Sequence, residues 1–455
     1  MIHKLNAIGI RGSLLNWFTD YLSNRKQSVV IKGKNSTYKT VTSGVPQGSV
    51  LGPTLFLIYI NDIVKDIESE VKLFADDTSM YLQMNDGLRR TDILNSDVQK
   101  ILIWSRLWKV DFNPSKTELL TISNNRNPET YPLTFNNSIL LETPTHKHLG
   151  VVLQNDCQWK SHIESIISKV RPQIACLRSF KHKFNRKTLE ILYKAYILPH
   201  LDYADVVWDS CSNALADDLE NAHLDALRTI TGSVRGTSHN KLYTESGFLP
   251  LKVRRERHKL TLFFKIVNGL APSYLASNLP PLVSDLNPYH RRRPFERQVP
   301  QFRLEIYRKS FFPSATVLWN GLSDNIKTIT SISHFKKCLS ANDHSVPPYY
   351  LVGSRTAQAI HCKLRLNMSD LQNDLFNRFL TDDKTCECGF AEENTHHYLL
   401  NCPRFNAVRA TTISILPPLA TSIDTLLFGN TNFSLPFNYY IFHTVQDFII
   451  NSKRF

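Results

Sequence analysis

Apolar residues recur along the first part of the chain with the spacing of helices and short strands. Residues 13–23 place them at helical spacing, and residues 27–31 then have the composition of a short strand. Residues 51–62 carry apolar positions over a broad face, which predicts a well-buried helix. We therefore expect helices and short strands within the first sixty residues.

Two further strands are expected on either side of an acidic turn. Residues 71–75 and 79–82 have strand composition, and Asp76-Asp77-Thr78 lies between them. Adjacent acids in a regular strand point to opposite faces, whereas at a hairpin tip both can reach one cleft. The pattern predicts a hairpin that carries two carboxylates at its tip.

Helical spacing returns after the hairpin and dominates the middle of the chain. It covers residues 97–108, after which strands are expected at 116–122 and 148–153. Residues from 159 to about 270 again have mainly helical spacing. Together these elements predict an α+β fold.

The length of the chain predicts more than one domain. Its 455 residues, 42% of them hydrophobic, can bury more than one core, because a single domain usually has ~100–200 residues. We expect four regions, with ranges 1–155, 156–280, 281–350 and 351–455.

The charge of the chain favours a polyanionic partner. Lysine and arginine outnumber acidic residues by 54 to 40, which gives a net charge of +14. Nucleic acid is the first candidate and an anionic membrane surface the second. The eight cysteines lack the spacing of a secreted disulfide framework, and neither a signal peptide nor an apolar run of ~18 residues is found. We expect a soluble, intracellular protein that is not secreted and has no membrane span.

A glycine-rich turn changes the interpretation of the acidic hairpin. By themselves, Asp76 and Asp77 would more often form a polar turn with an Asx-type hydrogen bond. Upstream, however, Gly44-Val45-Pro46-Gln47-Gly48 leads into residues 55–62. This ordered combination closely resembles the reverse transcriptases of non-LTR (LINE-like, jockey-type) retrotransposons. The resemblance implies that the turn lies against the incoming nucleotide and template, where residues without bulk let the backbone approach.

The resemblance extends further along the chain. Residues 17–27, 113–118 and 148–151 are similar to other segments of the same family, the last of which grips the primer. It implies a partial right-hand polymerase palm, a helical thumb-like region and a small zinc-knuckle-like C-terminal tail. By analogy Lys116 would protonate the departing pyrophosphate, with a solvated surface lysine as the alternative. Core packing is sufficient to explain four residues of the thumb-like stretch: Tyr193, Leu201, Tyr203 and Trp208.

The activity implied by the resemblance is RNA-directed DNA synthesis. Nucleotidyl transfer uses two divalent ions ~3.5–4 Å apart, and hard ions such as Mg²⁺ or Mn²⁺ prefer carboxylate oxygens. Asp76 and Asp77 would supply those oxygens. The implied partners are an RNA template, a DNA primer or target and dNTPs, and the implied location is the nucleus with a cytoplasmic ribonucleoprotein stage.

The sequence departs from the family at its beginning. The family supplies another metal-binding aspartate from an earlier strand with a pattern like Ala-Phe-Asp, which we expect upstream of Met1. Asp20 is the only acid before the glycine turn, and it lies in a segment of helical spacing. We therefore expect an N-terminally truncated chain that does not polymerise alone. The alternative is a non-catalytic nucleic-acid-binding remnant.

A cysteine and histidine cluster lies near the end of the chain. Cys386, Cys388, His397 and Cys402 are a ligand set that suits tetrahedral Zn²⁺, although the Cys-x-Cys spacing is tighter than usual. The alternative is two buried cysteines and an exposed reactive one. The cluster also resembles the terminal knuckle of such elements, which would contact nucleic acid. Neighbouring cations would then bind phosphates, with Phe405 or Tyr398 stacking on bases; these cations are Lys363, Arg365, Arg378, Lys384, Arg404 and Arg409.

Two basic runs are the remaining candidates for a charged interface. They are residues 254–259 and Arg291-Arg292-Arg293. Either run would suit a phosphate backbone or a nuclear import signal, and both would also be explained as solvated surface. The sequence alone leaves these three interpretations open.

Overall fold

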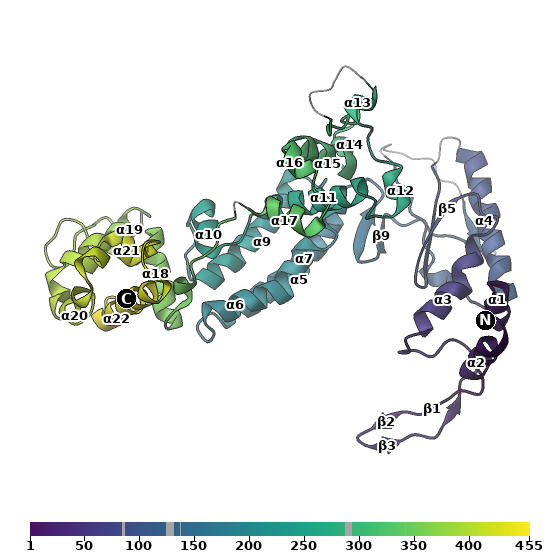
Figure 1. The fold of residues 1–455 in the computed structure, drawn as a ribbon, viewed down its shortest axis with the longest axis horizontal. Coiled ribbons are helices and arrows are strands. Elements are labelled where there is room, and N and C mark those ends of the chain that lie inside the picture. Colours follow the sequence, from purple (N-terminus) through teal and green to yellow (C-terminus); the bar gives the residue numbers. More distant parts are fainter. Residues whose placement is uncertain (84–86, 124–131, 137, 287–293, 342) are drawn as a thin grey trace. The chain divides into compact units, whose positions relative to one another are not determined.

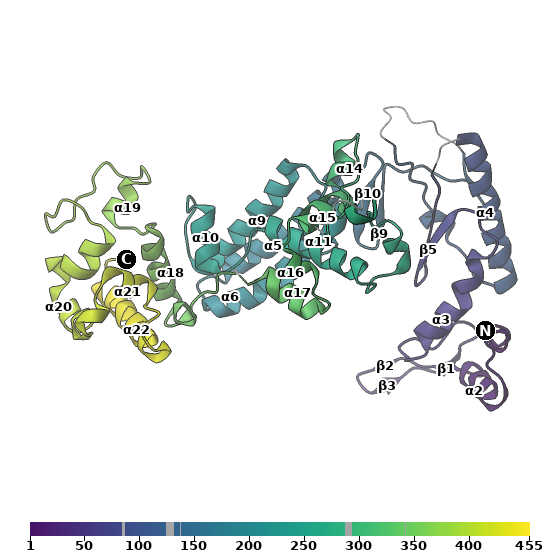
Figure 2. The ribbon, with the colours of Figure 1, turned by 45° about the horizontal axis from the view of Figure 1, so that its top comes forward.

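The protein is described here from a computed structural model that covers residues 1–83, 87–123, 132–136, 138–286, 294–341 and 343–455. Helices predominate, and the described strands lie in short two-stranded pairs (Figures 1 and 2). The chain divides into two compact units, Met1–His146 and Lys147–Phe455. The finer division expected at 155/156, 280/281 and 350/351 stays a prediction. Arg291-Arg292-Arg293 lies outside the described residues.

The first unit contains most of the elements expected near the N-terminus. The helix expected at 13–23 is confirmed as α2, and the helix expected at 51–62 as α3 and the short helix η1. The elements of this unit are α1 (Ile2–Ala7), α2 (Gly12–Leu22), β1 (Lys26–Gln27), β2 (Val30–Ile31), β3 (Lys34–Asn35), β4 (Lys39–Thr40), α3 (Gly52–Ile60), η1 (Asn61–Val64), β5 (Glu70–Phe74), β6 (Asp77–Tyr81), α4 (Gly87–Trp108), η2 (Pro114–Lys116), β7 (Thr134–Phe135) and β8 (Ser138–Ile139).

Three expected strands differ from the structure. The strand expected at 27–31 is divided, because β1 pairs with β4 whereas β2 pairs with β3. The strand expected at 116–122 is wrong: its first residue belongs to η2, and Leu119 makes an isolated bridge. The strand expected at 148–153 is two strands, because Gly150 takes a φ of +85° in a turn between β9 (Thr145–His148) and β10 (Val151–Gln154).

A buried lysine organises the core of the first unit. Lys4 of α1 is 5% exposed, and its Nζ lies 2.5 Å from Asp62 Oδ1. The same ammonium lies over the rings of Tyr59, Trp104 and Trp108, at 4.7, 4.8 and 3.8 Å from their centroids. Cation–π contacts strengthen when the cation is removed from water. Lys4 therefore fixes α1 against α3, η1 and α4.

The second unit is mainly helical, as expected for its first hundred residues. Its elements from β10 onward are α5 (Lys160–Ser179), α6 (Arg186–Leu192), η3 (Tyr193–Ile197), α7 (Leu198–Asp202), α8 (Asp205–Trp208), α9 (Asn213–Thr231), α10 (His239–Ser246), α11 (Leu251–Val267), α12 (Ser273–Ala276), α13 (Val283–Leu286), α14 (Glu305–Lys309), α15 (Phe311–Asn320), α16 (Asp324–Lys327), α17 (Ile332–Leu339), η4 (Pro348–Leu351), α18 (Arg355–Leu366), α19 (Gln372–Phe376), η5 (His397–Asn401), η6 (Pro403–Phe405), α20 (Asn406–Ala410), η7 (Ile413–Ile415), η8 (Pro418–Ala420), α21 (Ile423–Phe428) and α22 (Leu435–Ser452). None of the helices in the described ranges is long and apolar enough to cross a membrane.

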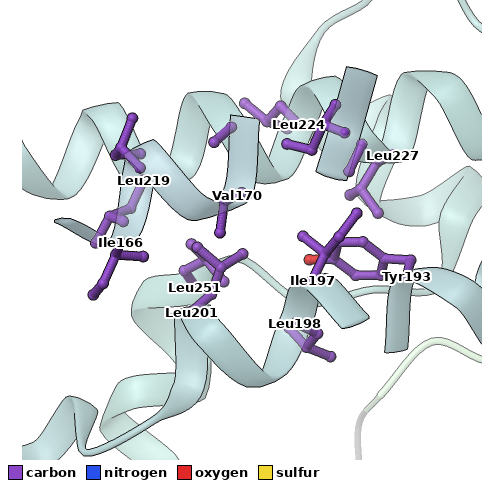
Figure 3. Close-up of a cluster of buried hydrophobic side chains, with 14 of the residues drawn as sticks. Ile166, Val170, Tyr193, Ile197, Leu198, Leu201, Leu219, Leu224, Leu227 and Leu251 are labelled. Atoms are coloured by element: carbon purple, nitrogen blue, oxygen red, sulfur yellow. The ribbon is translucent and has the colours of Figure 1, made fainter. Parts of the chain in front are cut away.

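The largest core lies between α5, η3, α7, α9 and α11. Burying a large aliphatic side chain stabilises a protein by ~1.5–3 kcal/mol relative to leaving it exposed. The core packing expected for Tyr193, Leu201 and Trp208 is confirmed, because each is at most 1% exposed. Figure 3 shows side chains of the cluster meeting between the helices: Ile166, Val170, Tyr193, Ile197, Leu198, Leu201, Leu219, Leu224, Leu227 and Leu251.

Three buried charges join helices that are far apart in sequence. Glu245 of α10 accepts hydrogen bonds from Arg186 of α6 at 2.7 Å and from Arg365 of α18 at 2.7 and 3.0 Å. All three residues are buried. Burial alone would raise the pKa of Glu245, but the two guanidinium groups outweigh burial and lower it. This triad connects the bundle to the C-terminal helices.

Two buried histidines should make the second unit sensitive to acid. Burial lowers the pKa of His162 to about 4 and of His223 to about 3, and the positive charges of Lys169 and Arg254 respectively add to the effect. In the unfolded chain both groups protonate near pH 6.5, so the unfolded state binds more protons at lower pH. The contribution of these two histidines to the free energy of unfolding is therefore fully present above pH 6.5 and is lost as the pH falls towards 4.

Because the unfolded chain takes up these protons more readily, we expect each histidine to lower the free energy of unfolding by roughly 2 kcal/mol at pH 5 relative to pH 7.5. Urea unfolding at a series of pH values measures this loss. His182→Gln, which removes an exposed histidine, should leave the profile unchanged. A flat profile between pH 7.5 and 5 would contradict the lowered pKa values.

Candidate functional site

The predicted acidic hairpin is present in the structure. Strands β5 and β6 pair in antiparallel register from Glu70 with Tyr81 to Phe74 with Asp77. Ala75, with a φ of +50°, and Asp76 form the two-residue turn. Both Asp76 and Asp77 are exposed at this tip. The two carboxylates are therefore accessible to solvent-borne ions.

No third ligand completes a metal cluster at the hairpin tip within the described chain. Groups of three or more cysteine, histidine or acidic ligands occur elsewhere, but none includes Asp76 or Asp77. Asp20 is exposed on α2, in the helical context expected from the sequence. The described residues thus offer two adjacent carboxylates at this place.

The glycine-rich turn is a backbone structure that larger residues would disturb. Gly44 and Gly48 have φ values of +78° and +76°, which favour glycine. A Cβ atom at Gly52 would lie 2.7 Å from the carbonyl oxygen of Pro46. Ser49 Oγ donates to the same oxygen at 2.7 Å. The turn therefore closes directly onto the start of α3, and Gln47 lies within it.

Lys116 lies at the end of η2 and is exposed. Asn113 caps this short helix, since its side-chain oxygen accepts from the backbone N–H of Ser115 at 3.0 Å. The exposure of Lys116 is compatible both with the proton donor implied by analogy and with a solvated surface lysine, so its role stays a prediction.

The hairpin at 148–151 is held by an aromatic residue of the helical bundle. Tyr203 Oη donates to the Leu149 carbonyl at 2.6 Å, and its ring lies 3.2 Å from where a Cβ of Gly150 would be. Tyr203 is 56% exposed, so its assignment to the core was wrong. Sequence reasoning missed this contact because Tyr203 lies far along the chain from the turn.

The four predicted ligands near the C-terminus come together. The candidate ligand atoms of Cys386, Cys388, His397 and Cys402 all lie within 4.8 Å of one another. Cys386 Sγ lies 3.8 Å from Cys402 Sγ, and Cys388 Sγ lies 3.2 Å from His397 Nε2. A disulfide would require ~2.05 Å between the sulfur atoms. The cluster is thus four free side chains converging on one point.

Neighbouring side chains hold this cluster in place. Arg409 donates to the carbonyl oxygens of Leu399 and Cys402, at 2.8 and 2.9 Å. The ring of Phe390 stacks on His397 with the centroids 4.3 Å apart. Burial raises the pKa of Cys386 to about 12. A coordinated metal ion would instead lower the pKa of this thiol, because the ion binds and stabilises the thiolate.

The aromatic stacking expected in the tail does not fit the structure, and the expected cations have partners within the protein. Tyr398 and Phe405 are 0% and 7% exposed, so neither presents a face for base stacking. Arg365 is in the buried triad and Arg409 supports the cluster. The remaining four cations each pair with an acid or a backbone carbonyl: Lys363 with Asp370, Arg378 with the Ser369 carbonyl, Lys384 with Glu392, and Arg404 with Glu387.

The basic side chains of the run at 254–259 form ion pairs with acids of the same protein. Arg254 pairs with Asp202, His258 with Asp205, and Lys259 with Asp209 at 2.6 Å. Two further pairs complete the set, Arg255 with Asp209 and Arg257 with Asp343. This part of α11 is therefore neither a solvated face nor free phosphate-binding charge.

The first third of the chain is similar to a known protein family. Residues 1–153 match the family described as "Reverse transcriptase (RNA-dependent DNA polymerase)". The RNA-directed DNA polymerase from mobile element jockey of Drosophila funebris is 29% identical over 244 residues, which is 51% of this chain and 26% of that protein. The probable RNA-directed DNA polymerase from transposon X-element of Drosophila melanogaster is 26% identical over 221 residues, or 47% of this chain and 24% of that protein.

Residues 1–153 are thus similar to the reverse transcriptase family. Within that class, about half of the chain resembles RNA-directed DNA polymerases of mobile elements such as jockey and the X-element. The resemblance identified from the glycine turn and the acidic hairpin is thus confirmed. The chain spans about a quarter of the length of these curated relatives.

Proposed function

We propose that the protein is part of the RNA-directed DNA polymerase of a non-LTR retrotransposon. In this proposal the first unit contributes a partial palm and the helical bundle a thumb. The observation that carries it is the exposed Asp76-Asp77 tip preceded by the strained glycine turn, both within the segment that matches the reverse transcriptase family.

Asp76 and Asp77 would hold Mg²⁺ or Mn²⁺ in the proposed site. Of the two divalent ions that nucleotidyl transfer uses, one would activate the primer hydroxyl and the other would neutralise the departing pyrophosphate. The backbone of Gly44 and Gly48 would face the nucleotide and template. Lys116 would donate a proton to the pyrophosphate, and the hairpin at 148–151 would grip the primer. An RNA template, a DNA primer or target and dNTPs are the corresponding partners.

Mn²⁺ binding to the 455-residue chain tests the metal role of the hairpin directly. We expect Asp76→Asn to weaken binding by roughly fivefold or more, because one of two adjacent carboxylate charges is removed. Asp66→Asn makes the same change at an exposed acid outside the hairpin and should have little effect. Equal affinities for the Asp76 variant and the unmodified chain would contradict the metal role.

Primer extension on an RNA template tests catalysis separately. We expect no incorporation from this chain alone, since its described residues place two carboxylates rather than three at the hairpin. Incorporation that Asp76→Asn abolishes would confirm the polymerase and overturn the expected inactivity. The alternative is a non-catalytic nucleic-acid-binding protein. It would be favoured if the chain binds RNA and Asp76→Asn leaves the Mn²⁺ affinity unchanged.

For the C-terminal cluster, we propose that Cys386, Cys388, His397 and Cys402 bind one Zn²⁺. Two sulfur atoms that lie ~2.3 Å from one zinc ion at the tetrahedral angle are about 3.8 Å apart. The distance between Cys386 Sγ and Cys402 Sγ is 3.8 Å. Three sulfurs and one imidazole nitrogen also form a closed set of the kind used in structural zinc sites. The tail would thus be a zinc-knuckle-like element.

A further inference from the structure

A basic cavity lies in the second unit, where the ends of α5 and α9 meet the start of α18. Its volume is about 550 Å³. Cationic side chains dominate its lining, and Asp225 is the acid among the described lining residues. The cations that matter for the following inference are Arg178, Lys181, Arg228, Arg235 and Arg355.

Much of this positive charge is not used inside the protein. Arg228 is paired with Asp225 at 2.9 Å. In the described part of the chain, by contrast, the side chains of Arg178, Lys181 and Arg235 make no hydrogen bond or ion pair. Arg178 and Arg235 are exposed and Lys181 is partly exposed. These three cations are therefore available to an external anion, unlike the cations of α11.

Arg355 gives the cavity a fixed positive wall. Its guanidinium donates to the carbonyl oxygens of Lys181, Thr229 and Ile230 at 2.7–2.8 Å. These acceptors carry no formal negative charge, and burial lowers the pKa of Arg355 to about 10. The group remains protonated at neutral pH. The backbone is also tightly packed here, because a Cβ on Gly232 would lie 2.5 Å from Ala359 Cβ.

The first turn of α18 adds further donors to the cavity. Arg355 and Thr356, the first two residues of this helix, both line it. Ser354 Oγ caps the N–H of Ala357 at 3.3 Å. Backbone N–H groups and the helix dipole at a helix N-terminus favour phosphate oxygens. The cavity thus combines unpaired cations, a fixed guanidinium and a helix N-terminus.

We propose that this cavity binds phosphate groups of a nucleic-acid strand through its backbone. Its described lining contains no phenylalanine, tyrosine or tryptophan on which a base could stack, so it is suited to phosphates rather than to a free nucleotide. A concave polar site also fits a strand better than the surface of a membrane. The partner class is that of the proposed function, but the site is independent of Asp76 and of catalysis.

Strand binding by the full 455-residue chain tests this site. The triple variant Arg178→Gln, Lys181→Gln, Arg235→Gln removes three cations whose side chains have no partner within the described residues. The matched control Arg171→Gln, Lys336→Gln, Arg303→Gln removes the same charges from exposed positions outside the cavity lining. Fluorescence anisotropy with labelled single-stranded oligouridine and oligothymidine, at several salt concentrations, measures affinity and its salt dependence.

We expect the cavity triple to weaken binding of both strands by about tenfold or more, and to reduce the slope of log K against log salt by about 2. Three lost phosphate contacts on a single strand account for that change. The control should retain the slope. Asp76→Asn should bind strands normally, which separates failure of this site from failure of the proposed polymerase function.

Three results would overturn the proposal. The first is an equal loss in the cavity triple and the control, which would indicate diffuse charge. The second is loss of binding to phosphatidylserine vesicles with strand binding unchanged, which would indicate a membrane surface. The third is full competition by inorganic phosphate at constant ionic strength, which would indicate an isolated phosphate ligand. The charge-retaining triple Arg178→Lys, Lys181→Arg, Arg235→Lys should bind normally and shows that a loss does not reflect misfolding.

Discussion

Cys402→Ser should abolish zinc binding and strongly destabilise the C-terminal part of the protein, whereas Cys176→Ser should do neither. Cys402 is completely buried, and its Sγ lies 3.8 Å from Cys386 Sγ. Cys176 is an exposed thiol on α5, outside the cluster. The pair of variants therefore makes the same chemical change inside and outside the proposed metal site.

The expected effect is large because metal binding is coupled to folding. Structural zinc contributes about 10–16 kcal/mol in zinc-finger peptides. Here α18, α21 and α22 also have an apolar core that includes Phe442 and Phe448. Loss of zinc should consequently cost several kcal/mol of unfolding free energy in this region while the bundle core remains folded.

Metal analysis and thermal unfolding check this prediction together. The unmodified protein and Cys176→Ser should contain about one zinc per chain, and Cys402→Ser should contain none. A chelator should lower the melting temperature of the first two proteins towards that of the third. Zinc retained by Cys402→Ser, or absent from the unmodified protein, would contradict the assignment.

Glu245→Gln should be the most damaging single change among the ion pairs described above. Glu245 is buried between Arg186 and Arg365. The neutral amide would leave the buried guanidinium of Arg365 without a counter-charge and that of Arg186 with Glu190 alone. Breaking a buried pair in this way typically costs about 3–5 kcal/mol. We therefore expect a comparable loss of unfolding free energy in the second unit.

Glu305→Gln provides the matched control for this substitution. Glu305 pairs with Arg308 on the surface, where solvent screens the charges and the pair contributes little to stability. Urea unfolding followed by far-ultraviolet circular dichroism measures both variants. Equal stabilities for Glu245→Gln and Glu305→Gln would show that the triad does not join the helices as described.

Local sequence patterns predicted the parts of the site that depend on local geometry. The acidic hairpin follows from two short apolar runs around Asp76-Asp77, and the turn follows from glycines that the structure holds at positive φ. The cysteine cluster also came together as expected, because its four ligands lie within a short segment. For these features, the determining contacts are close in sequence.

Contacts between distant segments could not be predicted in the same way. Nothing around Lys4 indicates that it lies over the rings of Tyr59, Trp104 and Trp108. The strand expected at 116–122 failed because local composition does not reveal whether a partner strand is available. Tyr203 has the character of a core residue, yet its ring covers Gly150 instead.

Because the basic residues of α11 form ion pairs, the accessible positive charge of the protein lies elsewhere than its basic run. A scan of the sequence for dense basic segments selects residues 254–259, whose side chains already neutralise acids within the protein. An import receptor or a nucleic acid would have to compete with these acids for the same groups. The accessible cations of the cavity are Arg178 and Lys181, near the end of α5, and Arg235, which joins them only in the folded chain.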